Sequence, residues 1–207
     1  MLFLYQETYY ATPGLQDVID KRVRSLHENH ATNPACVACD WMRYLGDPIT
    51  YLAFRLWSER DVTFDEGQLA FMSEYNRTRP PDAFIHGPEI EFFEQIAQAG
   101  ETGKAGFLAR SDLELAGRSS WREWEYELRK KLLAADGFHE YRLYRFMGGE
   151  NRHVRAEFWQ SQAAAEGFWH DPGLREFMSQ LGQRPFRRAP RVGYYEVLHQ
   201  TGDARMP

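Results

Sequence analysis

The strongest constraint on the fold is an internal repeat with a spacing of 102 residues. When the second half of the chain is moved back by 102 positions, residues of the same type coincide without gaps over long stretches. The matches lie mostly at the ends of expected elements, as in Arg43/Arg145, Gly46/Gly148, Trp57/Trp159, Pro88/Pro190 and Gly100/Gly202. Solenoid repeats are shorter, about 20 to 50 residues. The chain is therefore predicted to contain two copies of one domain-sized unit, residues 1–102 and 103–207.

Each copy is expected to follow the order strand, helix, strand, strand, helix, strand. In the first copy we predict strands over 3–10, 36–45, 50–57 and 90–97 and helices over 15–30 and 64–76. In the second copy we predict strands over 105–112, 138–147, 153–159 and 192–199 and helices over 119–134, capped by Ser119 or Ser120, and 162–181, broken near Asp171-Pro172. This order is the ferredoxin-like unit. Two such sheets back to back predict an α+β fold, a pseudo-dimeric α/β barrel within one chain, joined by a linker over 100–104.

Composition indicates an ordinary globular protein, with 43% hydrophobic residues and a net charge of −5. The first copy carries −8 and the second +3, so the copies are expected to attract each other, and the basic excess is too small to indicate nucleic-acid binding. The start of the chain lacks a charged region ahead of its apolar residues, and no apolar run is long enough to span a membrane. A cytoplasmic location is expected.

Two pairs of residues could bind a metal, but simpler interpretations are favoured. Cys36 and Cys39 fall on an expected strand, where positions three apart face opposite sides, so neither a disulfide nor a shared metal is expected. They are interpreted as small buried residues, with a redox or metal role as the alternative. His27 and His30 end a helix, where cations are favoured, with a metal pair as the alternative. No metal site is predicted.

The sharpest local signal is a row of polar side chains on one face of a strand. His153, Arg155, Glu157 and Trp159 alternate with apolar residues on a strand that is central in a ferredoxin-like sheet. Burying three ionisable groups without partners would be costly, so they must pair with one another or line a wet pocket. One interpretation is a structural ion pair beside a satisfied histidine. The other is a catalytic pocket in which His153 is an acid or base and Arg155 holds an anionic oxygen. Glu157 is the third candidate catalytic residue.

Aromatic residues are abundant, which favours a flat aromatic ligand, although residues at helical spacing also suit a core. The candidate substrate-binding residues are Tyr144, Trp159, Trp124, Phe168, Trp169 and Tyr195, with Arg55 from the matching face of the first copy. A basic loop containing Arg184, Arg187, Arg188 and Arg191 is either a solvated loop or a rim that attracts anions to a pocket mouth. The second copy is expected to hold the active pocket.

The second copy resembles the antibiotic-biosynthesis monooxygenase (ABM) type of domain in the dimeric α/β-barrel superfamily. The likeness is carried by the run from Val154 to Ala165, by Phe168-Trp-His-Asp-Pro172, and by Leu174-Arg-Glu-Phe177. In the first copy it is limited to Phe54 through Glu59 and to Phe71-Met72. The resemblance implies a superfamily of cofactor-independent oxygenases of quinols and polyketide aromatics, haem-degrading enzymes, isomerases and lyases. The Trp and His of the haem-degrading branch fall near Phe168 and Met178 here, so haem is disfavoured.

The resemblance and the polar row together favour a cofactor-independent oxygenase that acts on a small aromatic or quinol-type substrate. In this hypothesis His153 takes a phenolic proton and Arg155 stabilises the oxyanion. One alternative is a protein that binds a small aromatic or haem-like molecule without turnover. Another is a non-redox isomerase or cyclase that uses the same pocket. No motif of a nucleotide fold, zinc protease or ordinary serine hydrolase is present. The barrel is expected to close within one chain, and further association remains open.

Overall fold

The computed structural model describes residues 1–65, 70–101, 104–116, 121–180 and 186–202. These residues fall into two compact units. Unit 1 is formed by Met1–Gln95 and by the chain from Tyr195 onward, and unit 2 by Ile96–Tyr194. The units differ from the two sequence repeats, because the last strand of each repeat passes from one unit into the other.

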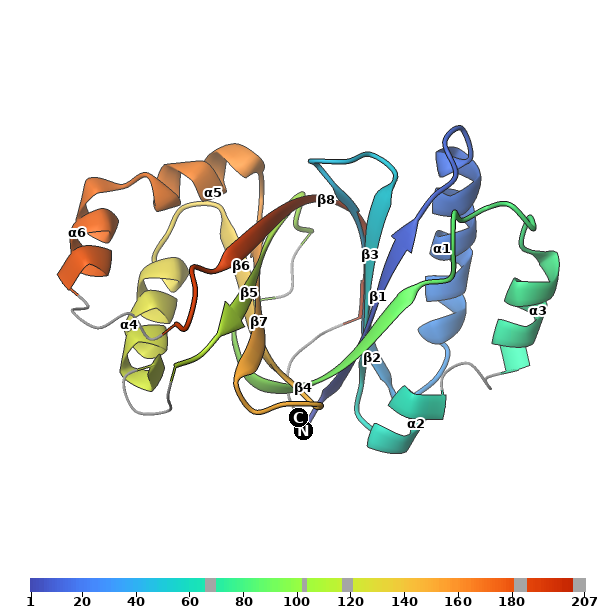
Figure 1. The fold of residues 1–207 in the computed structure, drawn as a ribbon, viewed down its shortest axis with the longest axis horizontal. Helices are drawn as coiled ribbons and strands as arrows, with labels where there is room; N and C mark the ends of the chain where they lie inside the picture. The colour runs from blue at the N-terminus through green and yellow to red at the C-terminus, as the bar shows by residue number, and fades with distance from the viewer. Residues whose placement is uncertain (66–69, 102–103, 117–120, 181–185, 203–207) are drawn as a thin grey trace. The chain divides into compact units, whose positions relative to one another are not determined.

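Both repeats have the element order predicted from the sequence (Figure 1). The first repeat contains β1 (Phe3–Tyr10), α1 (Gln16–His30), β2 (Cys36–Tyr44), β3 (Thr50–Trp57), α2 (Arg60–Asp65), α3 (Ala70–Thr78) and β4 (Glu89–Gly100). The second contains β5 (Phe107–Glu114), α4 (Trp121–Leu133), β6 (Phe138–Phe146), β7 (Arg152–Trp159), α5 (Gln162–Trp169), α6 (Pro172–Gln180) and β8 (Arg191–Gly202). The duplicated ferredoxin-like order is confirmed.

The duplication extends to the details of the strands. The burial patterns of β2 and β6 are identical, and so are those of β3 and β7. Each repeat also has a β-bulge at the same place, between Cys36 and Ala38 in β2 and between Phe138 and Glu140 in β6. A bulge inserts one residue and changes which side chains share a face. The prediction that Cys36 and Cys39 face opposite sides is therefore wrong, and their Sγ atoms lie 3.5 Å apart.

The strands pair in the order β1-β3-β2-β8-β5-β7-β6-β4, and β4 pairs with β1, which closes the barrel predicted from the sequence. Unit 1 contains β1, β3 and β2 with the first part of β4 and the last part of β8. Unit 2 contains β5, β7 and β6 with the remaining parts of the same two strands. Ala38 of β2 lies opposite Gly202 of β8, so the last strand of the second repeat is the neighbour of a strand of the first repeat.

Some element boundaries differ from the sequence prediction and others agree with it. The expected helix over 64–76 is replaced by α2, which begins earlier, and by α3, with residues 66–69 outside the described part of the chain. The predicted break near Asp171-Pro172 is confirmed, because α5 ends at Trp169 and α6 begins at Pro172. β5 begins at Phe107, two residues later than expected, which leaves the alternation of faces unchanged. Ser119, Ser120 and linker positions 102–103 lie outside the described residues.

The helix-covered face of unit 1 buries two histidines at the end of α1. His27 and His30 are both 0% exposed, so the helix end that was expected to favour cations is buried. The ring of His27 lies 5.8 Å from that of His199 and 6.4 Å from those of His30 and Trp41. Neither of its nitrogens has a hydrogen-bond partner. Burial, followed by the neighbouring His30 and His199, lowers the pKa of His27 well below its usual value, so the ring is neutral.

This depressed pKa predicts a loss of stability in mild acid. A histidine that is neutral in the fold contributes fully above the unfolded pKa of about 6.5, and protonation of the unfolded chain removes that contribution as the pH falls. Each pH unit below that value should cost up to about 1.4 kcal/mol for such a residue. We expect urea midpoints to fall between pH 7 and pH 5, and to fall less steeply in His27→Leu. Equal slopes in the two proteins would contradict this assignment.

Candidate functional site

The polar row predicted from the sequence lies on β7, between β5 and β6, and is buried. His153 and Arg155 are 4% and 5% exposed, and Glu157 and Trp159 are fully buried. The row faces the helices of unit 2, since Trp159 packs in the same cluster as Trp121, Trp124 and other residues of α4. The strand is therefore central, as predicted, and its ionisable groups must find partners within the unit.

Arg155 and Glu157 form a buried ion pair, with Arg155 Nε 2.6 Å from Glu157 Oε1. Arg155 Nη2 also donates to Ser111 Oγ on β5, at 3.3 Å. The second carboxylate oxygen of Glu157 accepts a hydrogen bond of 3.1 Å from Trp169 Nε1 at the end of α5. Glu157 therefore holds Arg155 and Trp169 in defined positions. Burial raises the pKa of Glu157, and the ion pair with Arg155 and the bond from Trp169 oppose that shift.

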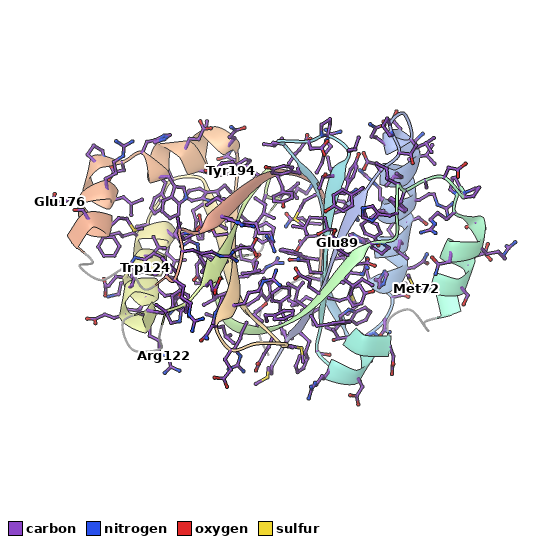
Figure 2. The ribbon with its side chains drawn as sticks, in the orientation of Figure 1. Met72, Glu89, Arg122, Trp124, Glu176 and Tyr194 are labelled. Carbon is purple, nitrogen blue, oxygen red and sulfur yellow. The ribbon has the colours of Figure 1, made fainter. Side chains whose placement is uncertain are left out.

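The guanidinium of Arg155 stacks on two indoles, 5.7 Å from the ring centre of Trp124 and 5.2 Å from that of Trp169. The three side chains line a cavity of about 550 Å³, here called the arginine pocket. Trp124, which Figure 2 labels, enters it from α4. The remaining lining comes from α6, from the loop before β8 and from the start of β8: Met178, Phe186, Arg187, Arg188, Ala189, Pro190 and Val192. The pocket is thus largely aromatic and apolar, with arginine as its polar component.

The mouth of the arginine pocket carries two more arginines from the basic loop noted in the sequence. The side chains of Arg187 and Arg188 are 54% and 55% exposed. Arg188 Nε lies 3.0 Å from Glu114 Oε2, and Arg187 Nη1 lies 3.9 Å from Glu114 Oε1. Glu114 and Glu157 offset two of the three arginine charges, so the groups around the pocket remain net positive. Of the other loop arginines, Arg184 lies outside the described residues and Arg191 is not among the lining residues.

His153 faces a different cavity, here called the histidine pocket. This cavity of about 470 Å³ is also lined by Trp121, Glu125 and Arg145. The ring of His153 lies 5.6 Å from that of Trp121. Burial lowers the pKa of His153, and Arg145 adds to that shift while a backbone contact with Asn151 opposes it. His153 and Arg155 are neighbours on β7, but the arginine pocket does not include the histidine.

Sequence reasoning did not select Tyr141, which belongs to this group. Tyr141 on β6 is fully buried and lies opposite Glu157 in the strand pairing. Burial raises its pKa well above the usual value, Glu125 adds to the shift, and Arg155 opposes it. The tyrosine is therefore a neutral hydroxyl next to the charges of both pockets. Tyr141 faces the helices because of the bulge after Phe138, and no turn residue in the sequence marks that bulge.

The structure separates several other predicted site residues from the arginine pocket. Trp159 is a core residue, with ring centres 5.1 Å from Phe138 and 5.4 Å from Phe168. Phe168 lines a third, more open cavity of about 680 Å³ between α4 and α5. Tyr144 lies opposite Val154, which alternates with the polar row, so it belongs to the other face of the sheet.

Two predicted site residues belong to unit 1. Arg55 forms a buried ion pair with Glu7 and stacks on the ring of Tyr5 at 5.0 Å. Arg55 corresponds to Glu157 by the 102-residue spacing, so both repeats bury a charged residue at this position, with opposite sign and with a partner from a different position. Tyr195 packs against Tyr44 with tilted rings, whose centres lie 5.3 Å apart. Neither residue is among those that line the arginine pocket.

Within the described ranges, no three His, Cys, Asp or Glu side chains are grouped closely enough to hold a metal ion. Across the same residues, every helix is too short or too polar to cross a lipid bilayer.

Comparison with known proteins relates the chain to solved structures alone. No protein-family model matches the sequence, and no curated protein sequence does. The structure is similar to that of a candidate monooxygenase from Fusobacterium nucleatum, with a TM-score of 0.81 and 7% identity over 100% of this chain and 98% of that one. A candidate monooxygenase from Lactobacillus acidophilus gives a TM-score of 0.77 and 6% identity over 100% and 99% of the two chains.

An anthrone oxidase-like protein gives a TM-score of 0.64 and 13% identity over 98% of this chain and 93% of that one. A ferredoxin-fold protein from Listeria monocytogenes, named as related to antibiotic biosynthesis monooxygenases, gives 0.54 and 12% over 95% of each chain. At such identities the likeness concerns the fold. The chain has the duplicated ferredoxin-like fold of proteins related to the antibiotic-biosynthesis monooxygenases.

Proposed function

We propose that the protein is a cofactor-independent oxygenase whose arginine pocket takes an aromatic or quinol-type molecule with an acidic hydroxyl group. The observation that carries the proposal is the position of Arg155, which is 5% exposed, stacked on two indoles and present in the lining of the pocket. Aromatic walls around a few polar groups suit a flat ligand. The likeness to an anthrone oxidase-like protein supports this substrate class.

The arginines provide the electrostatic part of the reaction. A phenol bound near Arg155, Arg187 and Arg188 ionises more readily, because the cations stabilise the oxyanion that forms. Its proton can leave to water at the mouth, where the loop arginines are half exposed. The role predicted for His153, accepting that proton, needs a path between the two pockets, and Tyr141 interacts with Glu125 of the histidine pocket and with Arg155 of the arginine pocket.

The oxidation then needs no group beyond substrate and dioxygen. The substrate anion gives one electron to dioxygen, and the resulting substrate radical and superoxide combine into a peroxide anion at carbon, which takes back a proton from water at the mouth to become a hydroperoxide. Loss of water from that hydroperoxide leaves a carbonyl, so a CH₂ group and O₂ become C=O and H₂O. The apolar residues Phe186, Pro190 and Val192 keep bulk water from the reacting carbon.

Oxygen uptake with a panel of anthrone-like and quinol substrates, in metal-free buffer, tests the proposal. We expect uptake with ionisable phenols and loss of uptake with their O-methyl ethers. The double variant Arg187→Gln/Arg188→Gln should lower kcat/KM about tenfold, because a charge-assisted contact is worth roughly 1.5–3 kcal/mol and 1.4 kcal/mol is a factor of ten. Arg175→Gln removes an exposed arginine of α6 outside the pocket and should leave kcat/KM unchanged.

Two results would contradict the proposal. Absence of oxygen uptake across the panel, with binding retained, would favour the alternative of a protein that binds a small aromatic molecule without turnover. Turnover that continues without oxygen would favour an isomerase or cyclase. In the same assay, an unchanged rate in His153→Ala would contradict the predicted role of His153 as the base.

A further inference from the structure

Two thiols of unit 1 lie in contact on β2. Cys36 Sγ and Cys39 Sγ are 3.5 Å apart, the distance of a thiol–thiol hydrogen bond. The bulge between Cys36 and Ala38 makes Val37 the extra residue, so both cysteines lie on one face of the sheet. A disulfide has an S–S length of about 2.05 Å, so the sulfurs would have to approach by roughly 1.5 Å.

The second repeat shows independently that this geometry is built into the fold. The equivalents of Cys36 and Cys39 at a spacing of 102 are Phe138 and Tyr141, and they flank the matching bulge in β6. Phe138 and Tyr141 both pack in the helix-facing cluster of unit 2. The shared face is therefore a property of the duplicated bulge, and only the first repeat places two sulfurs on it.

The two thiols differ in access to solvent. Cys36 is partly exposed, whereas Cys39 is fully buried. Cys36 packs at the edge of a small cluster formed by Tyr5, Ala35 and Trp57. A small reagent can therefore reach Cys36 first, and Cys39 is in position to attack the sulfur of Cys36 from the protein side.

We propose that Cys36 and Cys39 form a redox-active dithiol that exchanges with small disulfides such as glutathione disulfide. The thiolate of Cys36 attacks one sulfur of the small disulfide, forming a mixed disulfide and releasing one small thiolate. Cys39 then attacks the Cys36 sulfur, closing the Cys36–Cys39 bond and releasing the second small thiol. One small disulfide is reduced to two thiols, and the protein loses two hydrogens.

The full-length protein in buffers of varied glutathione to glutathione disulfide ratio provides the test, with acid quenching and intact mass measurement. The wild type should convert to a species that has lost two hydrogens, with no retained glutathione. Cys39→Ala should accumulate one glutathione adduct on Cys36, because the resolving thiol is absent. Cys36→Ala should remain largely unmodified, because Cys39 is buried.

The same titration in urea shows whether the folded geometry drives the reaction. The folded wild type should form the internal disulfide at a more reducing ratio than the unfolded chain, because the bulge holds the sulfurs together. A wild type that keeps a glutathione adduct as Cys39→Ala does would overturn the proposal. The proposal would also be overturned if the folded protein formed the disulfide at no more reducing a glutathione ratio than the chain in urea. This comparison uses the wild type alone, so it holds even where an alanine variant fails to fold.

Discussion

Cutting the chain between residues 102 and 103 is expected to leave neither half as a folded monomer. Residues 1–102 lose β8, which pairs with β2 from Ala38 to Tyr44, and residues 103–207 lose β4, the neighbour of β6. Each half would then expose an unpaired strand edge and a sheet face, which lead to self-pairing or aggregation. Light scattering and circular dichroism of each half, expressed alone, measure this effect.

Co-expression of the two halves is the control for that cut. Because β4 and β8 remain on separate fragments, the fragments should bind each other at one to one and recover the secondary structure of the intact chain. Two stable, monomeric halves would contradict the pairing of β2 with β8 and of β6 with β4.

Removing the carboxylate of Glu157 is expected to destabilise unit 2 strongly. In Glu157→Ala the buried guanidinium of Arg155 loses its ion pair, and Trp169 Nε1 loses its acceptor. Breaking one partner of a buried pair costs about 3–5 kcal/mol, since the other charge remains buried. Urea unfolding at pH 7 should show a loss of that size, accompanied by loss of ligand binding in the arginine pocket.

Two further variants separate the effect of losing the Glu157 charge from the effect of losing its side chain. Glu157→Gln keeps an acceptor for Trp169 and should cost less than Glu157→Ala. Replacing the pair together, as Arg155→Met/Glu157→Leu, removes both buried charges and should regain most of the lost stability while abolishing ligand binding. A cost below about 1 kcal/mol for Glu157→Ala would show that the ion pair is not the element that holds this site.

The sequence contained enough to predict the architecture, because glycine, proline and tryptophan at element ends are repeated at a constant spacing. It also placed His153, Arg155 and Glu157 on one buried face, since strand alternation is a local property. The bulges were not predicted: one extra residue after Cys36 or Phe138 reverses the faces that follow, and no turn residue marks it. This is why Cys39 was assigned to the wrong face and why Tyr141 was missed.

Which residues line each pocket depends on how the helices pack against the sheet, and strand alternation does not reveal that packing. Trp121 and Trp124 lie three apart on α4, and each covers a different member of the β7 row, so His153 and Arg155 open into different cavities. The bond from Trp169 to Glu157 depends on where α5 ends relative to β7. The alternative that Arg187 and Arg188 border a pocket agrees with the structure, but their effect on anions stays a prediction.

The pairing of β2 with β8 has a consequence for how the protein is made. Arg43 and Glu196, which pair across these strands, are 153 positions apart in the chain. During synthesis the first repeat leaves the ribosome well before β8 has been made, so the edge of β2 stays unpaired until then. Contacts of such long sequence separation slow folding, and domains ordinarily fold in the order of synthesis. The first unit of this chain to begin folding is thus among the last to finish, and in that interval the hydrogen-bonding groups along the edge of β2 are unpaired.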